Sequence, residues 1–122
     1  MLILVVLLIL TVIPVFLYFF PIVQICGYSM FPTLTDREFY LGRKLFNKSK
    51  LTVGKIYIYR PPYDREEERF VIKRLAEFKD GKCYFLGDNP NDSYDSRYYG
   101  YVSCDNVVAQ LLTRKGGVRA NG

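Results

Sequence analysis

The chain contains no histidine among its 122 residues. This absence excludes a hydrolase that activates its nucleophile through a Ser-His-Asp triad. It also excludes a zinc site that mixes histidine with cysteine, and the three cysteines, Cys26, Cys83 and Cys104, lack the close spacing of metal ligands. We therefore expect no metal ion and no cofactor, and a serine nucleophile in this chain would need a different base.

Charged residues are missing from the first part of the chain, because all 17 Lys and Arg and all 12 Asp and Glu lie at or after Asp36. Residues 2–23 are rich in Leu, Ile, Val and Phe, with interruptions at Thr11, Pro14, Tyr18 and Pro21. A helix that rises about 1.5 Å per residue needs roughly 20 residues to cross a hydrocarbon core about 30 Å thick. The sequence therefore predicts a transmembrane anchor at residues 1–23, kinked at Pro14 and leaving the bilayer near Pro21.

A cleavable signal peptide is the alternative interpretation of this run. Such a peptide has a basic segment before a shorter apolar core, and small residues at its cleavage site. No basic residue precedes Leu2 and residues 24–27 make a poor cleavage site, so a retained anchor is favoured. The count of Lys and Arg would place the following domain, in a chain of net charge +5, in the cytoplasm. That rule is weak for a whole folded domain, so it does not decide the orientation.

The residues after the anchor predict one small β-rich domain. Strand patterns rich in Val, Ile and Tyr occur at residues 39–45, 54–60, 70–78, 83–86 and 107–112. The second and third of these are expected to pair antiparallel, and Asp80-Gly81 is typical of a hairpin turn. We expect a mainly β protein with a single N-terminal transmembrane helix, a small antiparallel sheet or partial barrel over residues 24–113, and a basic tail at residues 114–122.

Two minor features have competing interpretations. Cys83 and Cys104 could form a disulfide if the domain faces an oxidising compartment, but three unpaired structural thiols are favoured. Lys44, Lys48 and Lys50 could suggest a nucleic-acid partner, yet no nucleic-acid motif accompanies them. A solvated loop, or a surface near anionic lipid headgroups, is favoured, so we expect no nucleic acid as a partner.

Ser29 lies shortly after the apolar run, in the string Gly27-Tyr28-Ser29-Met30-Phe31-Pro32-Thr33-Leu34. Pro32 makes a regular helix here unfavourable. Taken alone, a serine in such a segment is more often a turn or capping residue than a nucleophile.

Lys73 lies in the middle of the apolar strand pattern at residues 70–75. Strand alternation places it on the same face as Val71 and Leu75. Lysine is seldom buried without a reason, although a lysine that reaches water from an edge strand would also fit. Burial can lower the pKa of lysine from about 10.4 by up to about 3–5 units, which would let the amine accept a proton from serine.

A polar turn region occupies residues 87–100. It contains Gly87-Asp88-Asn89 and then Ser93-x-Asp95-Ser96-Arg97. Side chains of these types bind nearby backbone groups in turns, Asp95 and Arg97 could form an ion pair, and Ser93 could make a hydrogen bond nearby.

Four blocks of this sequence, in this order, resemble the type I signal peptidases, which are membrane-anchored endopeptidases with a serine and a lysine at the active site. Ser29-Met30-x-Pro32-Thr33-Leu34 resembles the nucleophile block, and residues 54–62 resemble the following strand block, with Lys55 where an acidic residue is common. Lys73-Arg74 resembles the base block, and the segment from Gly87 to Arg97 resembles the last block. The resemblance covers nearly all of the chain after residue 24.

The resemblance implies a role for each matching residue. Ser29 would be the acylated nucleophile, with its backbone N–H in the oxyanion hole, and Lys73 would be the general base. Ser93 would hydrogen-bond the lysine amine and orient it, while Asp95 and Arg97 would brace that loop. The remaining matches, which would support the site structurally, are Arg74, Gly87, Asp88 and Asn89.

The chain also departs from the family pattern. Some members carry a hydroxyl residue two positions before the nucleophile as a second oxyanion donor, where this chain has Gly27. Only the thirteen residues 74–86 separate Lys73 from Gly87, which is too few for the additional β-domain of larger members. The resemblance therefore implies a minimal catalytic core.

The function that the resemblance implies is a membrane-bound serine endopeptidase that removes N-terminal signal peptides from exported proteins and cleaves after small residues. Its partners would be precursor proteins and the lipid bilayer, and its catalytic domain would lie on the non-cytoplasmic side. One alternative is a dedicated maturation or conjugation peptidase of the same superfamily with a single client. Another is a membrane-anchored β-domain without enzymatic activity that binds a partner.

Overall fold

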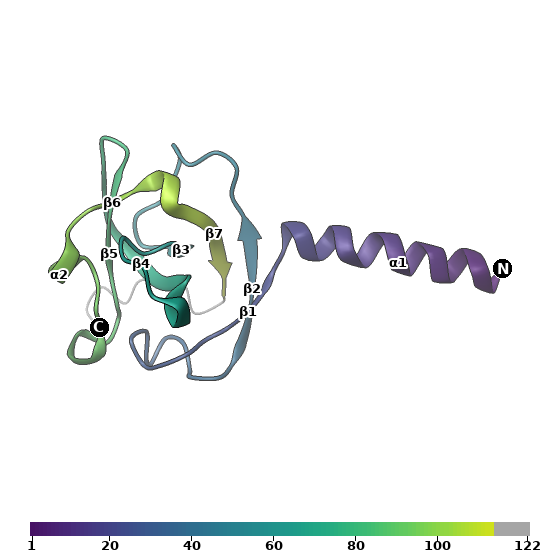
Figure 1. The fold of residues 1–122 in the computed structure, drawn as a ribbon, viewed down its shortest axis with the longest axis horizontal. Helices are drawn as coiled ribbons and strands as arrows, with labels where there is room; N and C mark the ends of the chain where they lie inside the picture. Colours follow the sequence, from purple (N-terminus) through teal and green to yellow (C-terminus); the bar gives the residue numbers. More distant parts are fainter. Residues whose placement is uncertain (114–122) are drawn as a thin grey trace.

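Helix α1 (Leu2–Phe19) projects away from the rest of the chain in the computed structural model, which describes residues 1–113 (Figure 1). None of its residues is buried, and among the described helices it is the one long and apolar enough to cross a membrane. The helix continues through Pro14 and ends before Pro21. The basic tail predicted at residues 114–122 lies outside the described residues.

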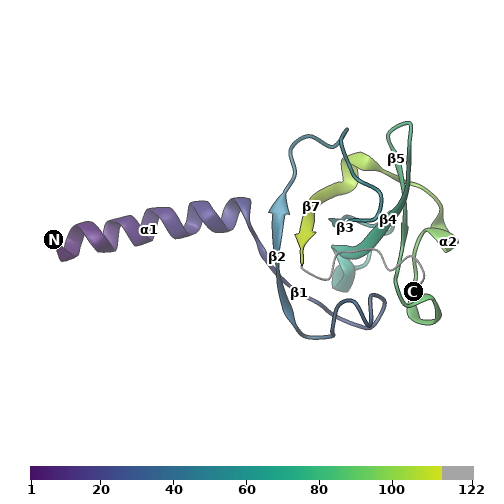
Figure 2. The same cartoon turned by 180° about the vertical axis from the view of Figure 1, so that it is seen from behind.

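Seven strands within the described residues form one curled antiparallel sheet, a half-barrel, so the domain is mainly β as predicted (Figures 1 and 2). The strand order is β1-β2-β7-β3-β4-β5-β6. The strands are β1 (Ile22–Gln24), β2 (Phe39–Lys44), β3 (Ile56–Tyr59), β4 (Val71–Lys79), β5 (Lys82–Leu86), β6 (Val102–Ser103) and β7 (Val107–Leu112).

The five predicted strands correspond to β2, β3, β4, β5 and β7, and β3 pairs antiparallel with β4 as expected. The two strands that the sequence did not indicate, β1 and β6, are three and two residues long. The other elements of the described residues are short helical turns: η1 (Glu66–Glu68), η2 (Pro90–Asp92), α2 (Ser96–Tyr99) and η3 (Cys104–Asn106).

The predicted hairpin turn joins β4 to β5. Lys79 pairs with Lys82, which leaves Asp80 and Gly81 as the two-residue loop. Both loop residues have positive φ, 51° and 75°, the conformation for which Asp-Gly is suited. This turn sets the register as far as Glu77, and a shift of one residue between Leu75 and Glu77 then places Arg74 opposite Leu86, the last pair between the two strands.

Strand β3 is buried on both faces because it separates two clusters of apolar side chains. The first cluster is formed by Leu51, Tyr57, Tyr59, Val71, Leu75, Cys83, Phe85, Val102, Cys104 and Val107. The second cluster is formed by Ile25, Met30, Leu34, Ile56, Ile58, Ala109 and Leu111. The second cluster anchors the segment around residue 29 to the sheet.

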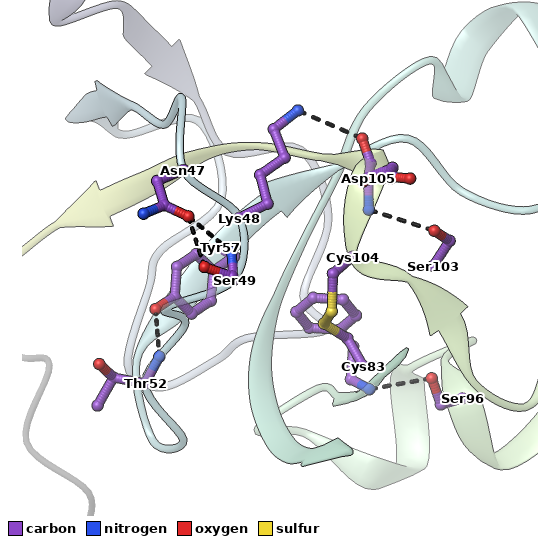
Figure 3. The surroundings of a disulfide bond; sticks show 11 residues. Asn47, Lys48, Ser49, Thr52, Tyr57, Cys83, Ser96, Ser103, Cys104 and Asp105 are labelled. Atoms are coloured by element: carbon purple, nitrogen blue, oxygen red, sulfur yellow. Dashed lines mark hydrogen bonds between the residues drawn. A yellow bond between two sulfur atoms is a disulfide. The ribbon is translucent and has the colours of Figure 1, made fainter. Parts of the chain in front are cut away.

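Cys83 and Cys104 form a disulfide bond, so the favoured interpretation of three unpaired thiols is wrong (Figure 3). The short strand β6 explains the pairing, because Val102 lies opposite Cys83 and the N–H of Cys104 donates to the carbonyl of Gly81 at 3.0 Å. These contacts bring the two cysteine Cα atoms within 5.7 Å, a separation that a disulfide bridges readily. Cys26 is free and exposed.

Replacing both Cys83 and Cys104 with alanine is expected to lower the free energy of unfolding by about 3 kcal/mol, the usual effect of opening a loop of this size. The sequence separation of the two cysteines is 21, and the closed loop contains the whole polar turn region. Chemical denaturation of the protein in detergent, with and without reductant, measures the change. Equal unfolding midpoints for the two proteins would show that the bridge contributes nothing.

Candidate active site

Ser29 lies in a tight turn that two buried side chains hold against the sheet. Met30 is 2% exposed and Leu34 is fully buried in the second apolar cluster. The N–H of Leu34 donates to the carbonyl of Met30 at 2.9 Å, so the segment folds back on itself without forming a regular helix, as the presence of Pro32 predicted. Ser29 remains half-buried at the edge of this turn.

Lys73 lies on β4, opposite Tyr57 of β3, and only 6% of it is exposed. Val71 and Leu75 are buried on the same face, so the predicted alternation is confirmed. The Lys73 Nζ donates a hydrogen bond to the Ser29 Oγ at 2.7 Å. The fold thus brings together a serine and a buried lysine that lie 44 positions apart in the sequence.

Burial lowers the pKa of the Lys73 amine, because the charged form loses its hydration. The carboxylates of Asp95, Glu68 and Asp92 oppose this effect, since negative charge favours the protonated amine. Burial is the larger effect, so the neutral amine is more accessible near neutral pH than in an ordinary lysine.

The turn at residues 87–89 holds the backbone of the Ser29 segment. The N–H of Asn89 donates to the carbonyl of Ser29 at 2.8 Å, and the Asn89 side chain donates to the carbonyl of Tyr28 at 2.9 Å. The N–H of Asp88 approaches the Met30 sulfur at 3.4 Å. These contacts fix the position of the Ser29 hydroxyl from the backbone side.

Asp88 connects this turn to β4 and to the Ser29 segment at once. Its carboxylate accepts two hydrogen bonds from Arg74, at 2.9 and 2.7 Å, and one from the Thr33 hydroxyl at 2.6 Å. Arg74 also donates to the carbonyl of Gly54 at 2.6 Å. Burial alone would raise the pKa of Asp88, but the hydrogen bonds from Arg74 and Thr33 hold it below its ordinary value.

Asp95 is fully buried and collects the hydrogen bonds of its own loop. It accepts from the Ser93 hydroxyl at 2.6 Å, from the N–H of Gly87 at 2.8 Å and from the Nε of Arg97 at 2.9 Å. Burial raises the pKa of this carboxyl, but these donors outweigh burial and hold the pKa well below its ordinary range. The predicted pair between Asp95 and Arg97 is therefore present.

Ser93 lines the same hollow as Ser29 and Lys73, but its hydroxyl donates to Asp95. The predicted hydrogen bond between Ser93 and the Lys73 amine does not occur among the described residues. The Ser93 side chain instead packs against Gly87. In this structure Ser93 is therefore linked to the Ser29 segment through Asp95 and Gly87.

Gly87 is buried where the Ser93 side chain and the Ser29 carbonyl converge. A Cβ at this position would overlap the Ser93 hydroxyl and lie 2.7 Å from the Ser29 carbonyl oxygen. A carbonyl in the backbone cannot move aside as a flexible side chain can, so an added methyl group would displace the Ser29 segment.

Gly87→Ala is therefore expected to lower kcat/KM for peptide cleavage by at least about 100-fold and to destabilise the domain by about 1–3 kcal/mol, the usual cost of overpacking. Gly42→Ala is the matched control, because a Cβ there meets its nearest neighbours at 3.5 Å, an ordinary contact. Steady-state kinetics and thermal unfolding of both variants give the comparison. Normal activity of Gly87→Ala would contradict the packing described here.

Two hollows meet at Ser29 and Lys73. One, of about 380 Å³, is lined by the apolar side chains of Ile25, Met30, Phe70, Val71 and Ile72, and also by Gln24, Glu67 and Glu68. The other, of about 560 Å³, is lined by tyrosines and carboxylates, which are Tyr28, Tyr63, Tyr94, Tyr98, Glu68 and Asp92. A chain segment that passes from one hollow into the other would cross the Ser29 hydroxyl.

The backbone N–H of Ser29 donates to no other residue within the described part of the chain, and is available to an oxyanion. The N–H of Gly27 is occupied, because it donates to Asp36 at 2.7 Å. Gly27 has φ of 97°, a conformation that a side chain disfavours. A second oxyanion donor of the kind found in some signal peptidases is therefore not supplied at this position.

Sequence reasoning missed four residues of this site. Thr33 was part of the nucleophile block but received no role, and Met30 was not recognised as the buried anchor of the turn. Glu68 and Asp92 received no role, yet both line the hollow that contains Lys73. The spacing of Thr33 from Ser29 carried no signal, because the partner of Thr33 is Asp88, 55 residues later.

Comparison with known protein families matches residues 76–114 to the family described as signal peptidase, peptidase S26. The matched segment includes Gly87, Ser93 and Asp95 and excludes Ser29 and Lys73. This match is consistent with a member of the type I signal peptidase family and supports, at the level of the family, a serine protease of the signal peptidase type. A search of curated proteins finds no match to the chain.

Proposed function

We propose that the protein is a membrane-bound serine endopeptidase that removes signal peptides by means of a Ser29/Lys73 dyad. One observation carries the proposal: the amine of a buried lysine lies 2.7 Å from the hydroxyl of a half-buried serine. A charged lysine buried without a function would only destabilise the domain. The family match over residues 76–114 supports the same function.

In the proposed reaction the neutral Lys73 amine takes the proton of the Ser29 hydroxyl as Ser29 attacks the carbonyl carbon of the scissile peptide bond. The N–H of Ser29 donates to the oxyanion that develops on that carbonyl. Lys73 then gives the proton to the leaving amine, and an acyl-enzyme remains on Ser29. Lys73 next activates a water molecule, which releases the signal peptide and restores the serine.

The open edge of β4 offers a place for an extended substrate. Pairing between β4 and β5 ends at Arg74, whereas pairing with β3 continues to Val71. Within residues 1–113, the segment 71–73 therefore has a neighbouring strand on one side only. A substrate that adds as a strand on the other side, a common mode of peptide recognition, would place its carbonyl beside the dyad.

The proposed localisation is a single membrane span with the peptidase domain, residues 24–113, on the non-cytoplasmic side. Helix α1 is long and apolar enough to span the bilayer. The disulfide between Cys83 and Cys104 supports this orientation, because such bonds persist in oxidising compartments and are rare in the cytoplasm.

The full-length protein in detergent, incubated with a precursor that carries an Ala-x-Ala site, is expected to release the signal peptide after the second alanine. Mass spectrometry of the products identifies the bond. A matched precursor with phenylalanine in place of that alanine should not be cleaved, because the resemblance to signal peptidases implies cleavage after small residues. If the first precursor remains intact, the domain is not a signal peptidase, and a binding role would be favoured.

Ser93→Ala is expected to lower kcat by about 10- to 1000-fold with little change in KM, the range for one positioned hydrogen bond at an active site. The reason is indirect, since Ser93 binds Asp95 and packs against Gly87, which contacts the Ser29 carbonyl. Ser103→Ala is the control, because that hydroxyl caps η3 away from the dyad. A wild-type kcat for Ser93→Ala would remove Ser93 from the catalytic arrangement.

A further inference from the structure

The hollow with the tyrosines differs from its neighbour in its aromatic rings and in Asp92, whereas Glu68 lines both hollows. Glu68 and Asp92 line the hollow with the tyrosines from two separate helical turns, η1 and η2. Among the described residues, the only cation that lines it is Lys73, which acts as a neutral amine in the proposed reaction. Arg65 pairs with Glu68 at 3.3 Å, but both side chains are about half exposed, and such a pair is weak. The hollow is therefore negatively charged.

Two of the tyrosines that line this hollow, Tyr63 and Tyr94, already interact with a cation. The guanidinium of Arg65 lies 5.0 Å from the ring centre of Tyr63 and 5.8 Å from that of Tyr94. The rings of Tyr94 and Tyr98 stack with their centres 5.3 Å apart, and 68% of Tyr98 is exposed. Faces of tyrosine rings attract cations, so the tyrosines and the two carboxylates of this hollow both favour a cationic ligand.

The position of this hollow along the substrate follows from the proposed function. Under the proposed function, the hollow lined by Ile25, Met30, Phe70 and Ile72 receives the side chains that precede the scissile bond, and both hollows include Ser29 and Lys73. The residues that follow the scissile bond must then enter the hollow with the tyrosines. We propose that this hollow is a subsite for a lysine or arginine side chain at the first or second residue after the scissile bond, an inference that rests on the proposed function.

Cleavage of matched Ala-x-Ala precursors tests this subsite. One series carries Lys, Ala or Glu at the first residue after the scissile bond, and a second series carries them at the second residue. At one of the two positions, the precursor with Lys is expected to have a kcat/KM about tenfold higher than the precursor with Ala, and the precursor with Glu should have the lowest. The reason is that ring faces and carboxylates attract a cation and repel a carboxylate. Raising the salt concentration should reduce the preference.

Variants of the two carboxylates test the same preference from the protein side. Glu68→Gln should reduce the ratio of kcat/KM for Lys over Ala, and Asp92→Lys should invert the ratio of Lys to Glu. Ratios are compared because both substitutions also alter the electrostatic environment of Lys73, which affects every substrate alike. Glu77→Gln, an exposed carboxylate on β4 that lines neither hollow, is the control that should keep the wild-type ratio.

The outcomes distinguish a failure of the proposed subsite from a failure of the proposed peptidase activity. Efficient cleavage of all precursors with equal kcat/KM at both positions would overturn the subsite and leave the peptidase intact. A preference for Lys that survives in both Glu68→Gln and Asp92→Lys would also overturn it, because the preference would then arise elsewhere. Cleavage of none of the precursors would overturn the peptidase and the subsite together.

Discussion

Replacing Ser29 with alanine is expected to lower kcat by on the order of 10⁶-fold, the usual result of removing the nucleophile from a serine hydrolase. The Ser29 hydroxyl is the group that the Lys73 amine contacts at 2.7 Å, and it is the proposed site of acylation. Without it no acyl-enzyme forms, and what remains is the effect of substrate positioning. Single-turnover assays with the Ala-x-Ala precursor and a large excess of protein measure the residual rate.

The fold should be retained in Ser29→Ala, because the turn is held by Met30, Leu34 and the backbone contact to Asn89 rather than by the hydroxyl. Near-ultraviolet circular dichroism and thermal unfolding check this. Ser49→Ala, at an exposed serine in a loop, is the matched control and should cleave normally. Substantial turnover by Ser29→Ala would eliminate the dyad as the catalytic group.

The parts of the fold that the sequence predicted are those with a strong local signal. Five strands carried alternating or continuous apolar patterns, and the Asp80-Gly81 turn had the residue pair that its positive φ angles require. Lys73 was identifiable for the same reason, since a lone lysine within an apolar strand pattern conflicts with its surroundings. Such local conflicts often mark functional positions.

The features that the sequence missed depend on contacts between distant residues. Strand β6 is two residues long, too short for any periodicity, yet it aligns Cys83 with Val102 and so produces the disulfide. Sequence spacing alone could not reveal that Cys83 and Cys104 lie close together. The interpretation of unpaired thiols failed because it lacked this strand.

The contacts that support the segment around Ser29 could likewise not be predicted from the sequence. Thr33 and Asp88 lie 55 positions apart, and each has an ordinary reason to occur in a turn. Only the folded chain shows that Asp88 joins Thr33 to Arg74 and that Asn89 binds the Ser29 backbone. The role of Ser93 is a similar case, because the resemblance implied a contact with Lys73 and the hydroxyl donates to Asp95 instead.

Replacing Lys73 with arginine is expected to abolish cleavage, with a loss comparable to that of Ser29→Ala, although the positive charge is kept. A guanidinium is not deprotonated in the accessible pH range, so it cannot take the proton of Ser29. Lys73→Met should be equally inactive, since it removes the base while keeping a long apolar stem. An active arginine variant would show that Lys73 serves only as a charged hydrogen-bond donor.

The activity of the wild-type protein is expected to rise with pH. Burial lowers the pKa of the Lys73 amine, so the neutral form becomes abundant at a lower pH than in an ordinary lysine, whose pKa is about 10.4. The profile of kcat/KM against pH should therefore show an ascending limb with a midpoint below that value. Glu68→Gln should move this limb to lower pH, because Glu68 favours the charged amine.

The same shift makes a prediction for stability that does not depend on activity. The relevant pH interval runs from the lowered pKa of Lys73 in the folded domain to about 10.4, the pKa of an ordinary lysine. Within this interval the unfolded chain binds more protons than the folded one. Lys73 therefore makes the free energy of unfolding rise with pH across the interval. Below the interval, the domain bears the cost of burying a charged amine. Lys73→Met lacks this cost, so its unfolding midpoint at pH 7 should equal or exceed that of the wild type, and the advantage should shrink by pH 10. The comparison uses the stability of Lys73→Met minus that of the wild type. If this difference were smaller at pH 7 than at pH 10, the buried charged amine would stabilise the domain, contrary to a lysine held there for catalysis.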